Sequence, residues 1–153
     1  MLGGVVFREA IRATLHGVDT GSPTQPGRGG DELPSLWVGH VVLATHDVIR
    51  SFAFYRDLGL RPVHEPRAAD GIAELELRGG THLVLVLDAD ARTIGRGGPF
   101  DFMADDLDAL HDSMENDGVE VSAIVRGGHA SFTFHDPDGW IVTVNDSHVV
   151  GLV

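Results

Sequence analysis

The sequence contains neither cysteine nor lysine among its 153 residues. The absence of cysteine excludes disulfides, thiol nucleophiles and cysteine-ligated metal sites. The absence of lysine excludes Schiff-base chemistry and the lysine of a phosphate-binding P-loop. Histidine, of which there are 9, and the carboxylates of Asp and Glu, of which there are 23, remain as the main reactive side chains.

Positive charge is scarce as well. The 11 arginines are outnumbered by the carboxylates, and the formal net charge is −12. A surface of this sign repels phosphate backbones and anionic lipids, so we expect no nucleic-acid partner and no membrane partner. A neutral or cationic small ligand suits it better. No apolar run approaches the ~20 residues of a membrane span, and Arg8, Glu9 and Arg12 stand where a signal peptide needs an apolar core. We therefore expect a cytoplasmic protein.

Residues 1–36 differ from the rest and are interpreted as an N-terminal extension. Val6–His16 has the spacing of a short amphipathic helix, and the linker after it is dense in Gly, Pro and Ser. The helix either docks on the domain or on a partner subunit, or it belongs to a loosely ordered extension. A structural or regulatory module that binds a partner through this helix is one functional hypothesis, and it rests on these residues alone. A single domain, residues 37–153, follows.

The pattern becomes regular from Val38 onward. In residues 38–90 an apolar strand precedes a helix that Asp47 caps and Gly59 ends. Three further strands follow, and the last two are joined through Gly79-Gly80, which is a strong hairpin signal. The predicted order is strand, helix and three strands.

The same order recurs in residues 98–148. Asp105 or Asp106 caps the second helix, Gly118 ends it, and three strands follow. An offset of about 59 residues brings the cap, the helix end and the hairpin glycine of the two segments into register. The sequence therefore predicts an α+β fold in which two βαβββ repeats form a cupped mixed sheet.

Two motifs link this pattern to a known family. The helix motif SFAFYRDLGLRPV and the turn HDPDGW with its following strand resemble the vicinal oxygen chelate superfamily. That superfamily includes glyoxalase I, fosfomycin-resistance enzymes, extradiol dioxygenases and bleomycin-resistance proteins. The resemblance covers about Val38 to His148 and implies the fold, a ligand site on the cupped sheet and a homodimer. It does not select one activity, because one fold hosts several chemistries.

The resemblance also implies where a divalent metal would lie. Metal enzymes of the superfamily take ligands from the first and last strands of each repeat. These positions correspond here to His40, Val84, Pro99 and Thr143, of which only His40 is a metal ligand type. If the first hairpin is slipped by two residues, His82 takes a ligand position, which still leaves fewer than the three protein ligands usual for a catalytic ion. We therefore expect no metal cofactor. The alternative is a divalent metal such as Mn, Fe, Ni or Zn held by His40 or His82.

Strand parity selects the candidate ligand-binding residues. The family position of His40 and the alternation of His82 with two valines favour a place in the cavity for both. The alternatives are a buried core histidine for His40 and a surface histidine beside the turn for His82. Asp101 interrupts an apolar strand, and it is either an acid/base group or an exposed edge residue. Near the end of the chain His129, Thr143 and Asn145 alternate with apolar residues along two strands, so they could supply hydrogen bonds in an otherwise apolar pocket. The predicted ligand site comprises His40, His82, Asp101, Met103, His129, Thr143 and Asn145.

Two further expectations concern acidic and histidine side chains. Glu74 and Glu76 alternate with apolar residues, and solvated charge is favoured for both because glutamate is rarely buried. A nonstandard metal site from His82, Asp101, His129 and His148 is chemically reasonable, but no spacing demands it.

The function favoured by the sequence is metal-independent binding of a small molecule, as in bleomycin-resistance proteins. Such a protein sequesters an apolar or cationic compound through apolar burial and a few placed polar groups. The alternative is a metal-dependent, glyoxalase-like lyase or isomerase, or a dioxygenase, that uses His40 or His82.

Overall fold

The computed structural model describes residues 38–67, 70–90 and 96–147. The predicted N-terminal extension and His148 lie outside the described residues. From His40 onward the chain forms one compact unit. No helix among the described residues is long and apolar enough to cross a membrane.

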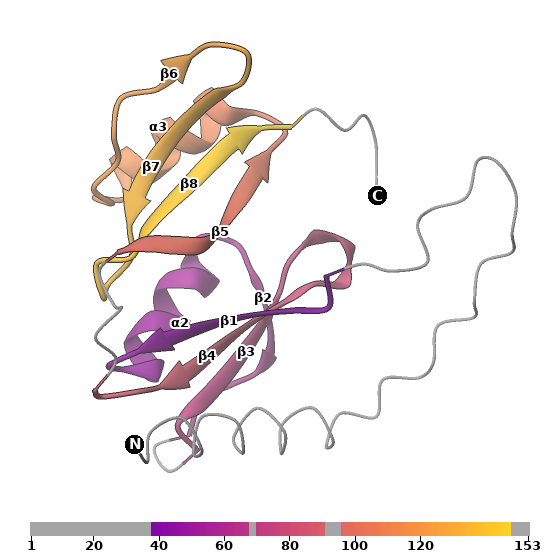
Figure 1. Cartoon of the computed structure of the whole chain (residues 1–153), viewed down its shortest axis with the longest axis vertical. Helices are drawn as coiled ribbons and strands as arrows, with labels where there is room; N and C mark the ends of the chain where they lie inside the picture. Colours follow the sequence, from indigo (N-terminus) through magenta and orange to yellow (C-terminus); the bar gives the residue numbers. More distant parts are fainter. Residues whose placement is uncertain (1–37, 68–69, 91–95, 148–153) are drawn as a thin grey trace, which may run out of the picture. The chain divides into compact units, whose positions relative to one another are not determined.

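The first repeat has the predicted order of elements. Strand β1 (His40–Thr45) leads to helix α2 (Val48–Asp57), and three strands follow (Figure 1), namely β2 (Arg61–His64), β3 (Ile72–Glu76) and β4 (His82–Leu87). A short 3-10 turn, Arg78–Gly80, joins β3 to β4, and its two glycines have positive φ. The strands form one sheet in the order β1-β4-β3-β2, with β1 parallel to β4 and the other pairs antiparallel.

The second repeat copies this arrangement. Strand β5 (Gly97–Ala104) leads to helix α3 (Leu107–Asn116), and the remaining strands are β6 (Val125–Arg126), β7 (Ala130–His135) and β8 (Ile141–Asp146). The sheet order is β5-β8-β7-β6, with β5 parallel to β8. The two sheets confirm the α+β fold of two βαβββ repeats. The strand expected over residues 119–125 is short, because pairing in residues 119–126 is limited to β6 and an isolated bridge between Val121 and Phe134.

Both helices begin and end where the sequence predicts. Asp47 accepts a hydrogen bond from the Arg50 amide at 3.0 Å, and Asp106 accepts one from the Ala109 amide at 2.9 Å. Each cap satisfies a backbone donor that has no partner within its helix. Gly59 and Gly118 follow the two helices with positive φ, a conformation that glycine adopts without a steric penalty. Of the two cap candidates in the second repeat, Asp106 is the cap.

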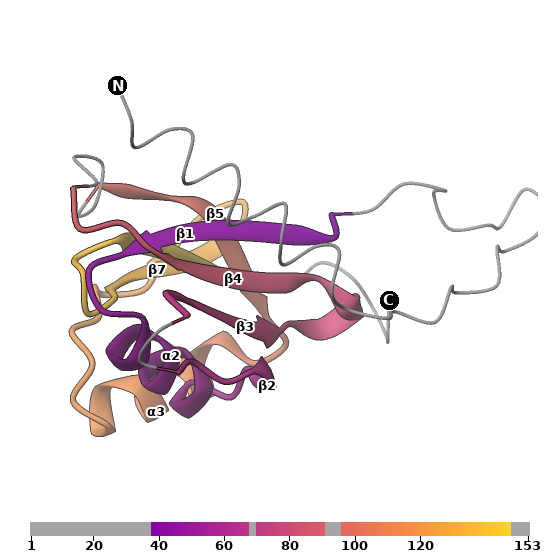
Figure 2. The same ribbon diagram turned by 90° about the horizontal axis from the view of Figure 1, so that it is seen from below.

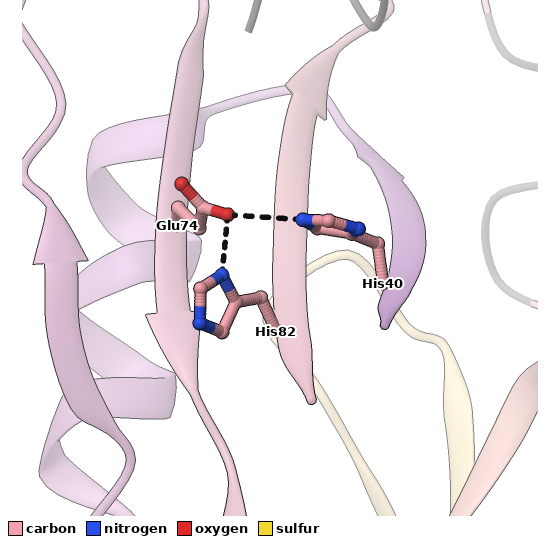
Figure 3. A group of neighbouring side chains, drawn as sticks. All are labelled: His40, Glu74 and His82. Atoms are coloured by element: carbon pink, nitrogen blue, oxygen red, sulfur yellow. Dashed lines mark hydrogen bonds and ion pairs between the residues drawn. The ribbon is translucent and has the colours of Figure 1, made fainter. Parts of the chain in front are cut away.

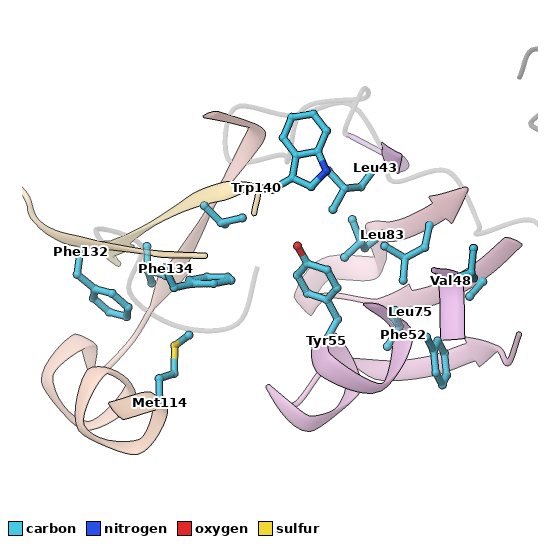
Figure 4. Packing of buried hydrophobic residues seen from close by; sticks show 14 of the residues in the cluster. Leu43, Val48, Phe52, Tyr55, Leu75, Leu83, Met114, Phe132, Phe134 and Trp140 are labelled. Atoms are coloured by element: carbon cyan, nitrogen blue, oxygen red, sulfur yellow. The ribbon is translucent and has the colours of Figure 1, made fainter. Parts of the chain in front are cut away.

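The apolar core lies between each helix and one face of its sheet. Helix α2 packs on β3 and β4 (Figure 2). Val48, Phe52 and Tyr55 are buried on its inner side, and Leu107 and Met114 are buried on that of α3, as their spacing predicts. Figure 4 shows the two groups of side chains, which belong to one buried cluster. Trp140 belongs to this cluster, and its indole Nε1 donates to the Ala44 carbonyl at 2.9 Å.

The turn between β7 and β8 connects the second repeat to the first. We define the acidic turn as residues 136–140. The Asp136 carboxylate accepts hydrogen bonds from the backbone amides of Asp138 and Trp140, at 2.9 and 2.8 Å, and from the Tyr55 hydroxyl at 3.1 Å. Burial raises the pKa of Asp136, and this outweighs the three hydrogen bonds, which lower it. Burial also raises the pKa of Tyr55, and the neighbouring Asp136 raises it further.

Asp138 extends this connection toward the start of α2. Its carboxylate accepts hydrogen bonds from the Thr45 hydroxyl, from Ser51 Oγ at 3.2 Å and from Arg50 at 2.8 Å, and it contacts His46. Burial alone would raise the pKa of Asp138, but these hydrogen bonds and the charge of Arg50 outweigh it, so the pKa is lowered. The acidic turn therefore joins the repeats through charged hydrogen bonds as well as through apolar packing.

Candidate functional site

The candidate site lies on the face of the first sheet that is turned away from α2, which we call the distal face. Leu43, Leu75 and Leu83 point toward the helix and belong to the core. Alternate residues of the same strands must point the other way. Strand pairing arranges them in three rows, which are Ala44, Val86 and Ile72, then Val42, Val84, Glu74 and His64, then His40, His82 and Glu76.

Three side chains converge on the distal face (Figure 3). His40 on β1 lies beside His82 on β4, with ring centroids 5.4 Å apart and nearly perpendicular planes. Glu74 on β3 lies diagonal to His82, because Glu74 pairs with Val84 and Glu76 pairs with His82. Diagonal neighbours across antiparallel strands are close enough for long side chains to meet. We call these three residues the His-Glu-His cluster.

Glu74 is the centre of the cluster. Its Oε1 atom lies 2.7 Å from His82 Nδ1 and 3.6 Å from His40 Nε2. Its side chain is only 2% exposed, whereas those of His82 and His40 are 16% and 38% exposed. The second carboxylate oxygen, Oε2, is buried and has no hydrogen-bond partner. The cluster thus reaches solvent through His40 and contains one unsatisfied acceptor at its base.

The expectation that Glu74 is a solvated charge is wrong. The residue is 1% exposed and lies beside Ile72, Val84 and Val86, which are buried on the same face. Glutamate is rarely buried without a partner, and here His82 and His40 are the partners. One sequence signal could have identified this position. The Gly79-Gly80 hairpin pairs Glu76 with His82, which places Glu74 one diagonal step from that histidine. Glu76, by contrast, pairs with the exposed Arg61 as an ordinary charged residue does.

The other predicted site residues lie on the second sheet. Asp101 on β5 pairs with Thr143 on β8, and Met103 pairs with Asn145. Asn145 Nδ2 donates to Asp101 Oδ2 at 2.7 Å. Asp101 and Met103 are exposed, and Thr143 and Asn145 are half-buried. The structure therefore brings these four together as one patch, in which three of the side chains are polar, and it places Asp101 exposed on an edge strand.

His129 has a separate environment from that patch. Its Nδ1 lies 3.2 Å from an Asp146 carboxylate oxygen, and His129 is exposed whereas Asp146 is half-buried. His148 belongs to the part of the chain that the structure does not describe. In the described part, the one group of three or more possible ligand residues close enough to share an ion is the His-Glu-His cluster. His82, Asp101 and His129 are thus not assembled into the nonstandard metal site that the sequence allowed.

The usual metal positions of the resembled superfamily do not fit an ion in this chain. Val84 is apolar and buried, Pro99 has no donor side chain, and Thr143 offers a hydroxyl in place of a carboxylate. His40 is the single matching ligand, and one imidazole is not enough to hold a catalytic ion. These four positions therefore do not form a catalytic metal site in this chain.

Comparison with known proteins agrees with this fold. The sequence matches the Glyoxalase/Bleomycin resistance protein/Dioxygenase superfamily over residues 37–144. The chain, with its paired βαβββ repeats and its polar residues on the sheet, belongs to this superfamily. A search of curated proteins finds no match to the sequence.

Solved structures with the same fold include members of different function. Lactoylglutathione lyase from Agrobacterium tumefaciens is 26% identical, with a TM-score of 0.61, and the match covers 79% of this chain and 100% of the enzyme. TnmS3, an antibiotic binding protein from Streptomyces sp. CB03234, is 24% identical, with a TM-score of 0.63 and coverage of 72% and 95%. An integron cassette protein from the Halifax Harbour sewage outfall metagenome is 20% identical, with a TM-score of 0.63 and coverage of 72% and 98%. The fold is therefore common to a binding protein and an enzyme.

Proposed function

We propose that this chain is a small-molecule-binding protein and that the distal face of the first sheet is its binding surface. The observation that carries the proposal is the buried Glu74 carboxylate, whose Oε2 has no partner. An unsatisfied buried acceptor costs about 1–3 kcal/mol, more when it is charged. A ligand that donates a hydrogen bond or carries a positive charge would recover this cost on binding.

The surroundings of Glu74 suit an apolar or cationic compound. Ile72, Val84 and Val86 provide apolar contact on the same face, and His40 and His82 provide polar groups beside the carboxylate. Small-molecule sites are mostly apolar with a few placed polar groups that fix orientation. The net charge of −12 adds a long-range attraction for cations. A protein of this kind acts through affinity and needs no nucleophile.

A metal-dependent lyase or isomerase is the second candidate. The 26% identity with the Agrobacterium lactoylglutathione lyase favours it. It requires an ion that the usual ligand positions of this chain do not hold. Turnover of dicarbonyl, catechol or epoxide substrates would support this candidate over binding alone.

The test is a ligand screen by thermal shift on the wild type, on Glu74→Gln and on Glu115→Gln. Glu115 is exposed on α3 and serves as the matched control. Compounds with an amine or guanidinium on an apolar frame should stabilise the wild type, by about 2.7 kcal/mol at 100 times the dissociation constant. Glu74→Gln should lose most of this shift and Glu115→Gln should keep it. Equal stabilisation of all three proteins would reject the distal face as the binding surface.

A further inference from the structure

We infer that His40, Glu74 and His82 form a binding site for one divalent transition-metal ion, held by residues of the first repeat alone. The inference deepens the proposed function, because the ion would lie on the same distal face and the small molecule beside it. The sequence favours binding without a metal. The arrangement of these three side chains in the structure instead supports the alternative, a divalent metal held by His40 and His82, and adds Glu74 as a third ligand.

The donor set has the right chemistry. Two imidazole nitrogens and one carboxylate oxygen form a common ligand set for non-haem iron, and His₂Glu is a known catalytic zinc set. The same donors accept manganese and nickel, with affinities ordered by the metal. The absence of cysteine from the chain leaves such nitrogen and oxygen sets as the means by which its side chains can hold a transition metal.

The donor atoms are close enough to share an ion. One ligand atom from each of the three residues lies within 4.8 Å of the other two. Two atoms bound to one ion at about 2.0–2.2 Å can lie at most about 4.4 Å apart. The Glu74 contacts, at 2.7 and 3.6 Å, already fall inside that limit. Convergence on one ion therefore requires small side-chain rotations and no movement of the strands.

The Glu74 carboxylate supplies the independent indication that a cation belongs here. It lies at the base of the cluster, its side chain is 2% exposed, and Oε2 has no hydrogen-bond partner. A buried carboxylate is retained when it is paired or coordinates a metal. Both histidine contacts are made to Oε1, so an ion shared with the imidazoles would displace the hydrogen bond from His82 and bind Oε1, and a bidentate carboxylate would also satisfy the unpaired Oε2.

The position of the site differs from the usual one. His40 comes from a first strand, but Glu74 lies on β3, which supplies none of the superfamily's ligand positions described above. His82 lies at the beginning of β4 and takes a ligand position only in the alternative alignment with a slipped hairpin. Adjacent strands of one sheet hold all three side chains, and sites built on strands are more precise than sites built on loops. Three protein ligands leave further coordination positions for water or a small molecule, and His40, 38% exposed, marks the accessible side.

The experiment is a titration of the full-length protein after removal of metals with a chelator. Zn²⁺, Ni²⁺, Mn²⁺ and, without oxygen, Fe²⁺ are added alone, and binding is followed by calorimetry and by elemental analysis after desalting. The variants are His40→Ala, Glu74→Gln and His82→Ala. His135→Ala is the matched control, because His135 Nδ1 lies 3.6 Å from a Glu120 oxygen, the same separation as His40 from Glu74.

We expect one ion per chain for at least one of these metals. Each variant of the cluster should weaken binding by at least about tenfold, since even outer-sphere changes cost that much, and His135→Ala should bind as the wild type does. Circular dichroism confirms that the variants are folded. If one variant does not fold, the other two and the Co²⁺ absorption spectrum of the wild type, which reports nitrogen and oxygen ligands, still decide.

Two results would overturn the inference. One is the absence of stoichiometric metal in the wild type with all four ions, and the other is metal binding that Glu74→Gln leaves unchanged. The ligand screen described above, repeated on chelated protein, separates the two proposals. A cationic compound that still binds through Glu74 while no metal binds would sustain the proposed function and reject the metal site.

Discussion

The hydrogen bond between Tyr55 and Asp136 offers a sharp test of how the acidic turn holds the two repeats together. Tyr55 is 0% exposed and Asp136 is 5% exposed, so water cannot replace either partner without local opening. Replacing Tyr55 by Phe keeps the ring in the core and removes only the hydroxyl. The change leaves Asp136 Oδ2 without its donor from the first repeat.

The magnitude follows from that geometry. A hydrogen bond to a charged group contributes about 1.5–3 kcal/mol, and a buried acceptor left unpaired costs a similar amount. We therefore expect Tyr55→Phe to lower the free energy of unfolding by about 2 kcal/mol. In a chain of this length such a loss corresponds to a decrease in Tm of about 4–8 °C.

The assay is urea denaturation at pH 7 followed by circular dichroism, on the wild type, Tyr55→Phe, Asp136→Asn and the double variant. The double-mutant cycle isolates the coupling between the two side chains, which we expect to be about 1–2 kcal/mol. A coupling below about 0.5 kcal/mol, or a Tyr55→Phe variant as stable as the wild type, would refute the role assigned to this bond.

Two further predictions concern the same turn. Asp138→Asn should cost about 1–2 kcal/mol at pH 7, because the carboxylate accepts hydrogen bonds from Thr45, Ser51 and Arg50. The pKa of Asp138 in the folded state is lowered from its usual value of 3.8, so this stabilisation is fully present above pH 3.8 and is lost as the pH falls through the folded-state pKa. Urea denaturation at pH 7 and at pH 3 should therefore show a smaller loss of stability in Asp138→Asn at the lower pH. Gly139→Ala should cost about 1–2 kcal/mol because φ is +83° there, whereas Gly128→Ala, without positive φ and with no atom within 4 Å of the added Cβ, should be near neutral in the same assay. Equal midpoints for the two glycine variants would contradict this reasoning.

The fold could be predicted because its signals are local. Asp47 and Asp106 cap their helices, the glycines that follow end them, and the hairpin glycines fix the β3–β4 register. Each of these features depends on a few consecutive residues. The shortness of β6 was missed because residues 119–125 alternate like a strand, yet continuous pairing with β7 is limited to Val125 and Arg126, and Val121 forms only an isolated bridge with Phe134. Pairing of an edge strand depends on its neighbour, which the pattern of one segment does not reveal.

The candidate site was only partly predictable for the same physical reason. His40 and His82 were identified from strand parity and from the resemblance, and the structure places them side by side. Glu74 was assigned to solvent from the average behaviour of glutamate. Its burial follows from partners on two other strands, one of them 34 residues earlier in the chain. The burial of a charge is decided by the groups around it in space, so composition and periodicity gave the wrong answer.

The acidic turn has a consequence for synthesis on the ribosome. The offset of 59 residues places Leu77, Gly79 and Thr81 at the corresponding turn of the first repeat, so only the later repeat has the two aspartates and the tryptophan. The groups they contact, which include the Ala44 carbonyl and the Thr45 and Tyr55 hydroxyls, emerge about 90 residues before them. Chains grow at about 5–20 residues per second. For several seconds the nascent first half therefore carries polar groups whose hydrogen-bond partners have not yet been synthesised, and these hydrogen bonds can form only when the last hairpin arrives.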